Sequence, residues 1–235
     1  MKRLFSVLSI TIICCAIYSC KKDSEKKSYC RITKLIFNDS REYDIKFGDN
    51  EKISAIEVMP DKLVSSYKYE NGKTIITVNL NGNFQYRLIV TTNSKGFATN
   101  VLAEENQAGT IWYNQAYTYE GNRVVNNKLT DYAGNSDDVN YIWEDGNIST
   151  LVEENDIYEY KYYADKKFQP GDWRDIQQLL SGYKLYECKN LLQSYEYNGK
   201  TTVYTYQFDD EGKIVEAKST NSSNTSTFKV EYDCK

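Results

Sequence analysis

Two Asn-Gly dipeptides, each followed by a run of alternating residues, constrain the fold of this chain more than any other feature. Asn71-Gly72 precedes residues 73–80, in which Thr74, Ile76, Val78 and Leu80 share one face, and Asn81-Gly82 precedes a second alternating run at 84–90. Asn and Gly tolerate the positive φ angles of a two-residue turn, so each dipeptide predicts a β-hairpin. Successive hairpins predict an antiparallel meander.

The hairpin signal recurs with paired aromatic residues before the turn. An aromatic residue, a spacer, a second aromatic residue, an acidic or amide turn and a glycine occur in the segments 117–121, 141–146, 195–199 and 204–212. We expect the paired tyrosines to cover cross-strand neighbours while their hydroxyls reach water. This packing accounts for the 22 tyrosines of the chain, with ligand stacking as the alternative for any one of them. The predicted fold is all-β, an antiparallel meander forming a large barrel-like or strongly curved sheet.

One segment breaks the β pattern. Pro170-Gly171 precedes Asp172, which can cap a first helical turn, and Trp173, Ile176 and Leu180 would share one face. Gly182 can close the C-terminus. The sequence predicts a short amphipathic helix near residues 172–181 that covers an end or an edge of the sheet, as a lid over the core or, alternatively, as a gate over a binding cavity.

The first twenty residues have the pattern of a lipoprotein signal. Lys2 and Arg3 precede an apolar run at 4–18, and Ser19 precedes Cys20. The run is too short to span a bilayer comfortably, which favours an export peptide, with an ordinary secretory signal or an uncleaved anchor as alternatives. The predicted segments are a lipoprotein signal peptide at 1–19, a lipidated tether at 20–28 that begins with Cys20, and a single β-rich domain at 29–235.

Lipid on Cys20 would anchor the chain in a membrane without a spanning segment. We expect an outer-membrane lipoprotein. Asp23 and Glu25 lie among lysines in the tether, and this mixture leaves open whether the protein faces the periplasm or the cell surface. The formal net charge is −4 for the whole chain, so no basic surface for nucleic acid is expected.

The cysteines beyond the tether suggest an oxidising compartment. Cys30 begins the first predicted strand and Cys234 ends the last, so a disulfide between them would join the chain ends; the alternative for each is a buried free thiol, for which Cys188 is the strongest candidate. The chain has no histidine, and the cysteines lack a C-x-x-C spacing. We therefore expect no metal site and no cofactor.

The tyrosine-rich hairpins and the closing stretches 191–197 and 204–214 resemble an uncharacterised family of Bacteroidota lipoproteins, a domain of unknown function described as porin-like. The hairpins are also similar to Rhs-type YD repeats. The resemblance implies a large antiparallel, barrel-like sheet and an envelope location, and it brings no catalytic or binding residues. A membrane pore is not expected, because the predicted strands at 41–47 and 156–161 carry charges on both faces, whereas a spanning barrel needs an outward apolar band.

Three functions remain open. The first is a non-enzymatic interaction or binding module whose sheet edge or tyrosine-rich face meets another envelope component. The second is a glycan-binding accessory lipoprotein, for which the candidate stacking residues are Trp112, Tyr113, Tyr141 and Trp143.

The third possibility is a glycoside hydrolase that uses two carboxylates. Without histidine there is no Ser-His-Asp or Cys-His arrangement, but carboxylate pairs need none. The visible acidic pairs, such as Glu104-Glu105 and Glu153-Glu154, consist of neighbours in sequence. Neighbours on a strand point to opposite faces, so we assign no catalytic residue. We expect that the protein is not an enzyme.

Overall fold

The computed structural model describes residues 30–234, which form sixteen strands and one helix. The predicted signal peptide, the tether and lipidated Cys20 lie outside the described residues. The strands are β1 (Cys30–Phe37), β2 (Glu42–Phe47), β3 (Ile53–Met59), β4 (Leu63–Glu70), β5 (Lys73–Leu80), β6 (Asn83–Thr92), β7 (Ala98–Glu104), β8 (Trp112–Glu120), β9 (Arg123–Asp131), β10 (Ser136–Glu144), β11 (Asn147–Glu153), β12 (Asp156–Lys167), β13 (Asn190–Tyr197), β14 (Lys200–Phe208), β15 (Ile214–Thr220) and β16 (Thr225–Cys234). The helix is α1 (Trp173–Ser181).

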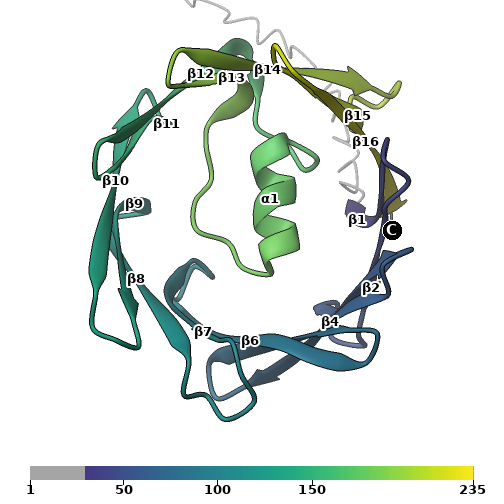
Figure 1. Ribbon diagram of the computed structural model, residues 1–235. Coiled ribbons are helices and arrows are strands. Elements are labelled where there is room, and N and C mark those ends of the chain that lie inside the picture. Colours follow the sequence, from purple (N-terminus) through teal and green to yellow (C-terminus); the bar gives the residue numbers. More distant parts are fainter. Residues whose placement is uncertain (1–29, 235) are drawn as a thin grey trace, which may run out of the picture.

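The strands form one closed antiparallel barrel in which every strand pairs with its neighbours in sequence and β1 pairs with β16 (Figure 1). The predicted all-β meander with one short helix is confirmed, and of the two forms expected for the sheet the barrel is the one observed. The Asn-Gly turns form as expected, since Asn71 and Gly72 have φ angles of 49° and 74°. Closure pairs both edges of the sheet, so the barrel presents no free edge strand.

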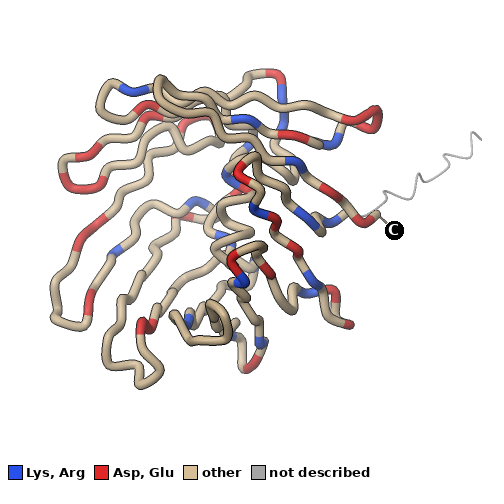
Figure 2. Tube along the Cα trace, turned by 45° about the vertical axis from the view of Figure 1, so that its right-hand side comes forward, with Lys and Arg blue, Asp and Glu red and all other residues tan. Residues whose placement is uncertain are grey.

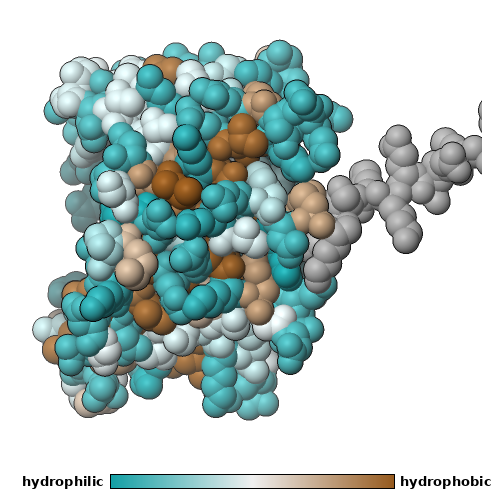
Figure 3. Space-filling view, turned by 90° about the vertical axis from the view of Figure 1, so that its right-hand side faces the viewer, coloured by the Kyte–Doolittle hydropathy of each residue, from teal (hydrophilic) through white to brown (hydrophobic). Residues whose placement is uncertain are grey.

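The wall of the barrel buries apolar side chains inside and carries ion pairs on its outer face. Leu35, Ile76 and Phe228 are at most 2% exposed and belong to the clusters that fill the interior. Along the outer face, ion pairs join Lys34 to Glu42, Lys46 to Glu57 and Arg87 to Glu104. Charged residues of both signs are spread over the strands and turns (Figure 2), and over β1, β2 and β16 hydrophobic side chains are interspersed among hydrophilic ones (Figure 3).

The expectation that residues 41–47 carry charges on both faces is wrong for β2, which spans Glu42–Phe47. In β2 the alternation places Glu42, Asp44 and Lys46 on the outer face, whereas Tyr43, Ile45 and Phe47 pack in the interior cluster. The outer face of β2 is therefore charged. Within residues 30–234, no helix has the length and apolar character needed to cross a bilayer.

The paired tyrosines face the interior of the barrel, and several of their hydroxyls are buried, contrary to the expectation that they reach water. Tyr117, Tyr204 and Tyr206 are at most 9% exposed. The hydroxyl of Tyr119 donates to the carbonyl of Ala98 at 2.7 Å, and other lumenal tyrosines likewise bond to buried oxygens. An interior wide enough to hold many phenol rings satisfies their hydroxyls internally, which is why these residues need not face solvent.

Helix α1 lies inside the barrel and not over an end or an edge of the sheet (Figure 1). It belongs to the connection between β12 and β13, residues 168–189, which we call the plug. Barrels of sixteen or more strands are too wide for their wall side chains to fill the interior. The plug occupies part of that space, which corrects the predicted position of the helix while its bounds and caps agree with the prediction.

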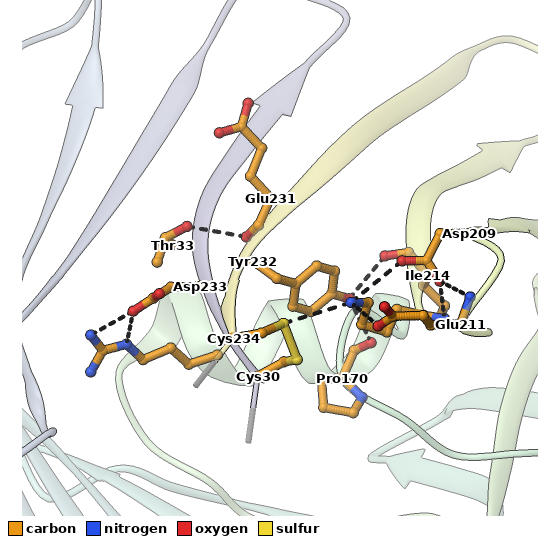
Figure 4. Close-up of a disulfide and its surroundings, with 12 residues drawn as sticks. Cys30, Thr33, Pro170, Asp209, Glu211, Ile214, Glu231, Tyr232, Asp233 and Cys234 are labelled. Carbon is orange, nitrogen blue, oxygen red and sulfur yellow. Dashed lines mark hydrogen bonds and ion pairs between the residues drawn. A yellow bond between two sulfur atoms is a disulfide. The ribbon is translucent and has the colours of Figure 1, made fainter. Parts of the chain in front are cut away.

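The barrel has two different rims. The terminal rim carries Cys30, Cys234, the base of the plug and the turn at 209–213, and the far rim carries the turns at 154–155, 198–199 and 221–224. A disulfide joins Cys30 to Cys234 on paired strands of the terminal rim (Figure 4). Cys188, in the plug, is a free and buried cysteine.

Candidate ligand site in the barrel lumen

Asp172 fixes the start of α1 to the barrel wall. Its side chain is 2% exposed and caps the helix by accepting from the backbone N–H of Arg174 at 2.9 Å. Its second oxygen accepts from the N–H of Leu192 in β13 and from the hydroxyl of Tyr206 in β14, each at 3.0 Å. Burial raises the pKa of this carboxyl, while these hydrogen bonds favour its charged form.

The other end of α1 packs against the opposite wall. Gly182 closes the helix in the left-handed conformation, with φ at 83°, and its N–H bonds to the carbonyls of Gln178 and Leu179. A Cβ on Gly182 would meet the side chains of Ile76 in β5 and Tyr67 in β4. The helix therefore crosses the lumen from β13 and β14 to β4 and β5, and glycine permits the close approach at its end.

The rest of the plug is hydrogen-bonded to itself and to the wall. The side-chain oxygen of Gln178 accepts from the N–H groups of Leu185 and Tyr186, and its amide nitrogen donates to the carbonyl of Tyr186 at 3.2 Å. The N–H of Ala98 in β7 donates to the carbonyl of Lys184 at 2.8 Å. These contacts hold the plug at a defined depth, so it divides the lumen.

A cavity of about 370 Å³ lies between α1 and strands β12 to β15. We call it the tyrosine cavity, after the four tyrosines that share its wall with Trp173. Its floor comes from α1 and its mouth lies near the far rim, since Thr202 lies near the start of β14 and Asn221 in the turn after β15. The lining residues are Tyr158, Tyr160, Trp173, Arg174, Gln177, Leu192, Tyr195, Thr202, Tyr204, Ser219 and Asn221.

The aromatic rings of the tyrosine cavity support one another. Ring centroids are 6.0 Å apart for Tyr160 and Tyr195, 6.3 Å apart for Tyr195 and Tyr204, and 5.2 Å apart for Trp173 and Tyr204. Such contacts are typical of stabilising aromatic pairs. Three strands and the helix thus build a wall of rings beside the hydroxyl and amide groups of Thr202, Ser219 and Asn221, an arrangement suited to a ligand with flat apolar faces and polar edges.

Arg174 contributes a positive charge to the floor. The residue is 6% exposed, and its Nη1 donates to the hydroxyl of Tyr186 at 2.7 Å. The guanidinium carbon lies 3.8 Å from the centre of the Tyr160 ring, within cation–π distance. Burial raises the pKa of both phenols, so they stay neutral beside the cation.

A second cavity, of about 380 Å³, opens at the terminal rim on the other side of α1. Phe47, Ile53 and Leu179 supply apolar walls, and Asp175 is the one carboxyl among its lining residues. Burial raises the pKa of Asp175 to about 6. Neither cavity is lined by two carboxyl groups, and residues 30–234 contain no group of three Asp, Glu or Cys side chains placed to hold a metal ion.

The four predicted stacking residues do not form one platform. Trp112 and Tyr113 are neighbours in β8 and face opposite sides of the wall, with Trp112 beside the outward Glu104. Tyr141 and Trp143 face the lumen, where Trp143 donates to the carbonyl of Val124 at 2.7 Å. None of the four lines the tyrosine cavity.

The residues of the tyrosine cavity were not singled out from the sequence as a site. Tyr195 belongs to the same aromatic hairpin signal as many other tyrosines, and Trp173 was read as part of a covering helix. The useful signal was the long interruption between two strands, residues 168–189, in a meander of otherwise short turns. Such a segment is where functional residues tend to concentrate.

Comparison with known proteins supports the fold and goes no further. No protein-family model matches the chain, and no curated protein matches its sequence. A crystal structure described as a porin-like protein from Bacteroides uniformis superposes with a TM-score of 0.62 at 12% sequence identity, covering 86% of this chain and 96% of that one. At this identity the likeness shows a shared porin-like barrel fold, and the similarity to YD repeats finds no match.

Proposed function

We propose that the chain is a membrane-anchored envelope lipoprotein that acts as a non-enzymatic binding module, with the tyrosine cavity as its ligand site. The observation that carries the proposal is the wall of aromatic rings beside polar groups in a cavity of about 370 Å³. Binding sites for small ligands have volumes of this order and the same mixture of surfaces. A glycan suits it, because sugar rings present apolar C–H faces to aromatic side chains and hydroxyls to polar ones.

The position of the cavity fits an anchored protein. The described chain begins at Cys30 on the terminal rim, next to the predicted tether, whereas Thr202 and Asn221 lie near the far rim. Lipid on Cys20 would keep the terminal rim close to the membrane, since residues 20–28 reach about 3 nm when extended. The mouth of the tyrosine cavity would then face away from the bilayer. The signal pattern and the barrel shared with a Bacteroides protein support an envelope location in a bacterium of the Bacteroidota.

An interaction with another envelope protein is the second candidate. The closed barrel has no free edge on which a partner could add a strand, so a partner would have to dock on the charged outer wall or on a rim. The hydrolase is the weakest candidate, because no carboxylate lines the tyrosine cavity. Crosslinking on intact cells tests for a protein partner, and capture of one specific envelope protein would favour the second candidate.

Titration calorimetry with a panel of bacterial and host oligosaccharides tests the binding function. We expect at least one oligosaccharide to bind the intact barrel and Tyr195→Ala to weaken that binding by tenfold or more. Tyr113→Ala is the matched control, because Tyr113 also lies in the barrel wall but does not line the cavity. Equal weakening by both variants, or binding by no member of the panel, would overturn the proposal.

Membrane anchoring has its own test. Substitution of Cys20 by Ala should abolish incorporation of labelled palmitate and move the protein from the membrane fraction to the soluble fraction. Retention of the label would show that lipid is attached elsewhere.

A further inference from the structure

Arg174 is a buried cation that no carboxylate neutralises by an ion pair. Within residues 30–234, Arg174 takes part in no ion pair. Its Nη1 donates a hydrogen bond to the hydroxyl of Tyr186. Asp172 is close enough to interact electrostatically with Arg174, but both of its carboxylate oxygens accept hydrogen bonds from other donors. The helix therefore carries an incompletely compensated positive charge into the lumen.

The other groups around Arg174 are neutral. They are Tyr141, Tyr160, Tyr162, Tyr186, Tyr204 and Cys188. Burial raises the pKa of each of these phenols and of the thiol, so none supplies a negative charge at neutral pH. The face of the Tyr160 ring attracts the guanidinium but offsets only part of what the cation loses on leaving water.

Arg174 is one of the residues that line the tyrosine cavity, and its guanidinium packs on the ring of Tyr160, which lines the cavity too. Arginine has five N–H donors in a planar fork, and the bond to Tyr186 uses one of them. The fork matches the two oxygens of a carboxylate or a sulfate better than any single hydroxyl. Gln177 and Thr202 line the same cavity and add neutral polar groups beside the charge.

We propose that the ligand of the tyrosine cavity is an acidic glycan unit whose oxyanion binds Arg174 while its ring stacks on the aromatic wall. This inference rests on the proposed function and adds the charge of the ligand. The oxyanion is the carboxylate of a uronic acid or the sulfate ester of a sulfated sugar, two sources of the same chemistry. The buried cation gains an anionic partner, which residues 30–234 do not provide as an ion pair.

Three matched trisaccharides test the charge requirement by calorimetry on the intact barrel: trigalacturonate, its neutral methyl ester, and a sulfated galactose trisaccharide. We expect at least one acidic ligand to bind tenfold or more tightly than the ester. Tighter binding of the carboxylate identifies a uronic acid, and tighter binding of the sulfate identifies a sulfated sugar. Equal affinity for all three would overturn the inference and leave the proposed function standing. Binding by none of the three would also overturn the inference, while binding of another member of the oligosaccharide panel would keep the proposed function.

Arg174→Gln should abolish the preference for the acidic ligand, and Arg174→Lys should keep part of it, because lysine retains the charge without the fork. Arg123→Gln is the control, since Arg123 is exposed at a turn and outside the cavity. Thermal melting offers a second readout that needs no glycan. At constant ionic strength, sulfate should raise the melting temperature of the unmodified protein and of Arg123→Gln more than that of Arg174→Gln; equal shifts in all three would contradict an anion site at Arg174.

Discussion

Asp175 is a partly buried carboxyl whose ionisation opposes folding. Burial raises its pKa to about 6 from the ordinary 3.8, although the N–H of Gly171 and the charge of Lys184 favour the ionised form. Between these two pH values the folded chain holds a proton that the unfolded chain has released. The contribution of this group therefore makes the protein less stable as pH rises from about 4 to about 6.

Replacing Asp175 by Asn should remove this pH dependence. The amide oxygen can still accept from Gly171, so the hydrogen bond is kept while the buried charge is lost. We expect the variant to be more stable at pH 7 by about 1–3 kcal/mol, as a shift of this size implies. Urea unfolding at pH 4 and at pH 7 measures the difference; a variant no more stable than the parent at pH 7 would show that the carboxyl is well solvated when charged.

Helix α1 shows which parts of the fold the sequence predicts and which it does not. Its caps are local signals: Asp172 and Gly182 act at the ends they were expected to mark. Its place in the lumen depends on the width of a barrel that closes between residues 30 and 234. A short stretch of sequence does not predict that width. The tyrosine cavity was missed for the same reason, because four strands and the helix supply its residues.

The close approach at the end of α1 makes Gly182 a sensitive position. Alanine there must hold a φ angle of 83° and would press its Cβ against Ile76 and Tyr67, so Gly182→Ala should destabilise the protein by about 2–4 kcal/mol. The matched control is Gly199→Ala, which has a φ angle of 68° but no atom within 4 Å of the added Cβ and should cost about 1 kcal/mol. Equal losses in denaturant unfolding would mean that the plug does not pack tightly against β4 and β5.

The whole barrel has two different faces. Ion pairs and scattered apolar side chains share the outer wall, and tyrosines, aliphatic residues and the plug occupy the interior. The alternation that produces these faces was readable from the hairpins, whereas the inward direction of the tyrosines was not, because period-two patterning does not say which face becomes the inside. The direction in which the sheet closes determines which face becomes the interior.

The disulfide between Cys30 and Cys234 should stabilise this closure. It joins residues separated by 204 positions on the two strands that close the barrel, so it restricts the unfolded chain strongly. Replacing both cysteines by Ser should lower the free energy of unfolding by about 2–4 kcal/mol. Reduction of the unmodified protein should have the same effect, and an unchanged melting temperature after complete reduction would contradict this role.

A ligand bound in the lumen above α1 would lie beside Trp173, so the emission of Trp173 reports on binding there directly. In a variant with Trp112→Phe and Trp143→Phe, Trp173 is the single tryptophan, and it lines the tyrosine cavity. Titration with the glycan that binds best in calorimetry should change the intensity or the wavelength of its emission, with a midpoint that matches the calorimetric affinity. A glycan that binds with that affinity while leaving the emission of Trp173 unchanged would place the site elsewhere on the barrel.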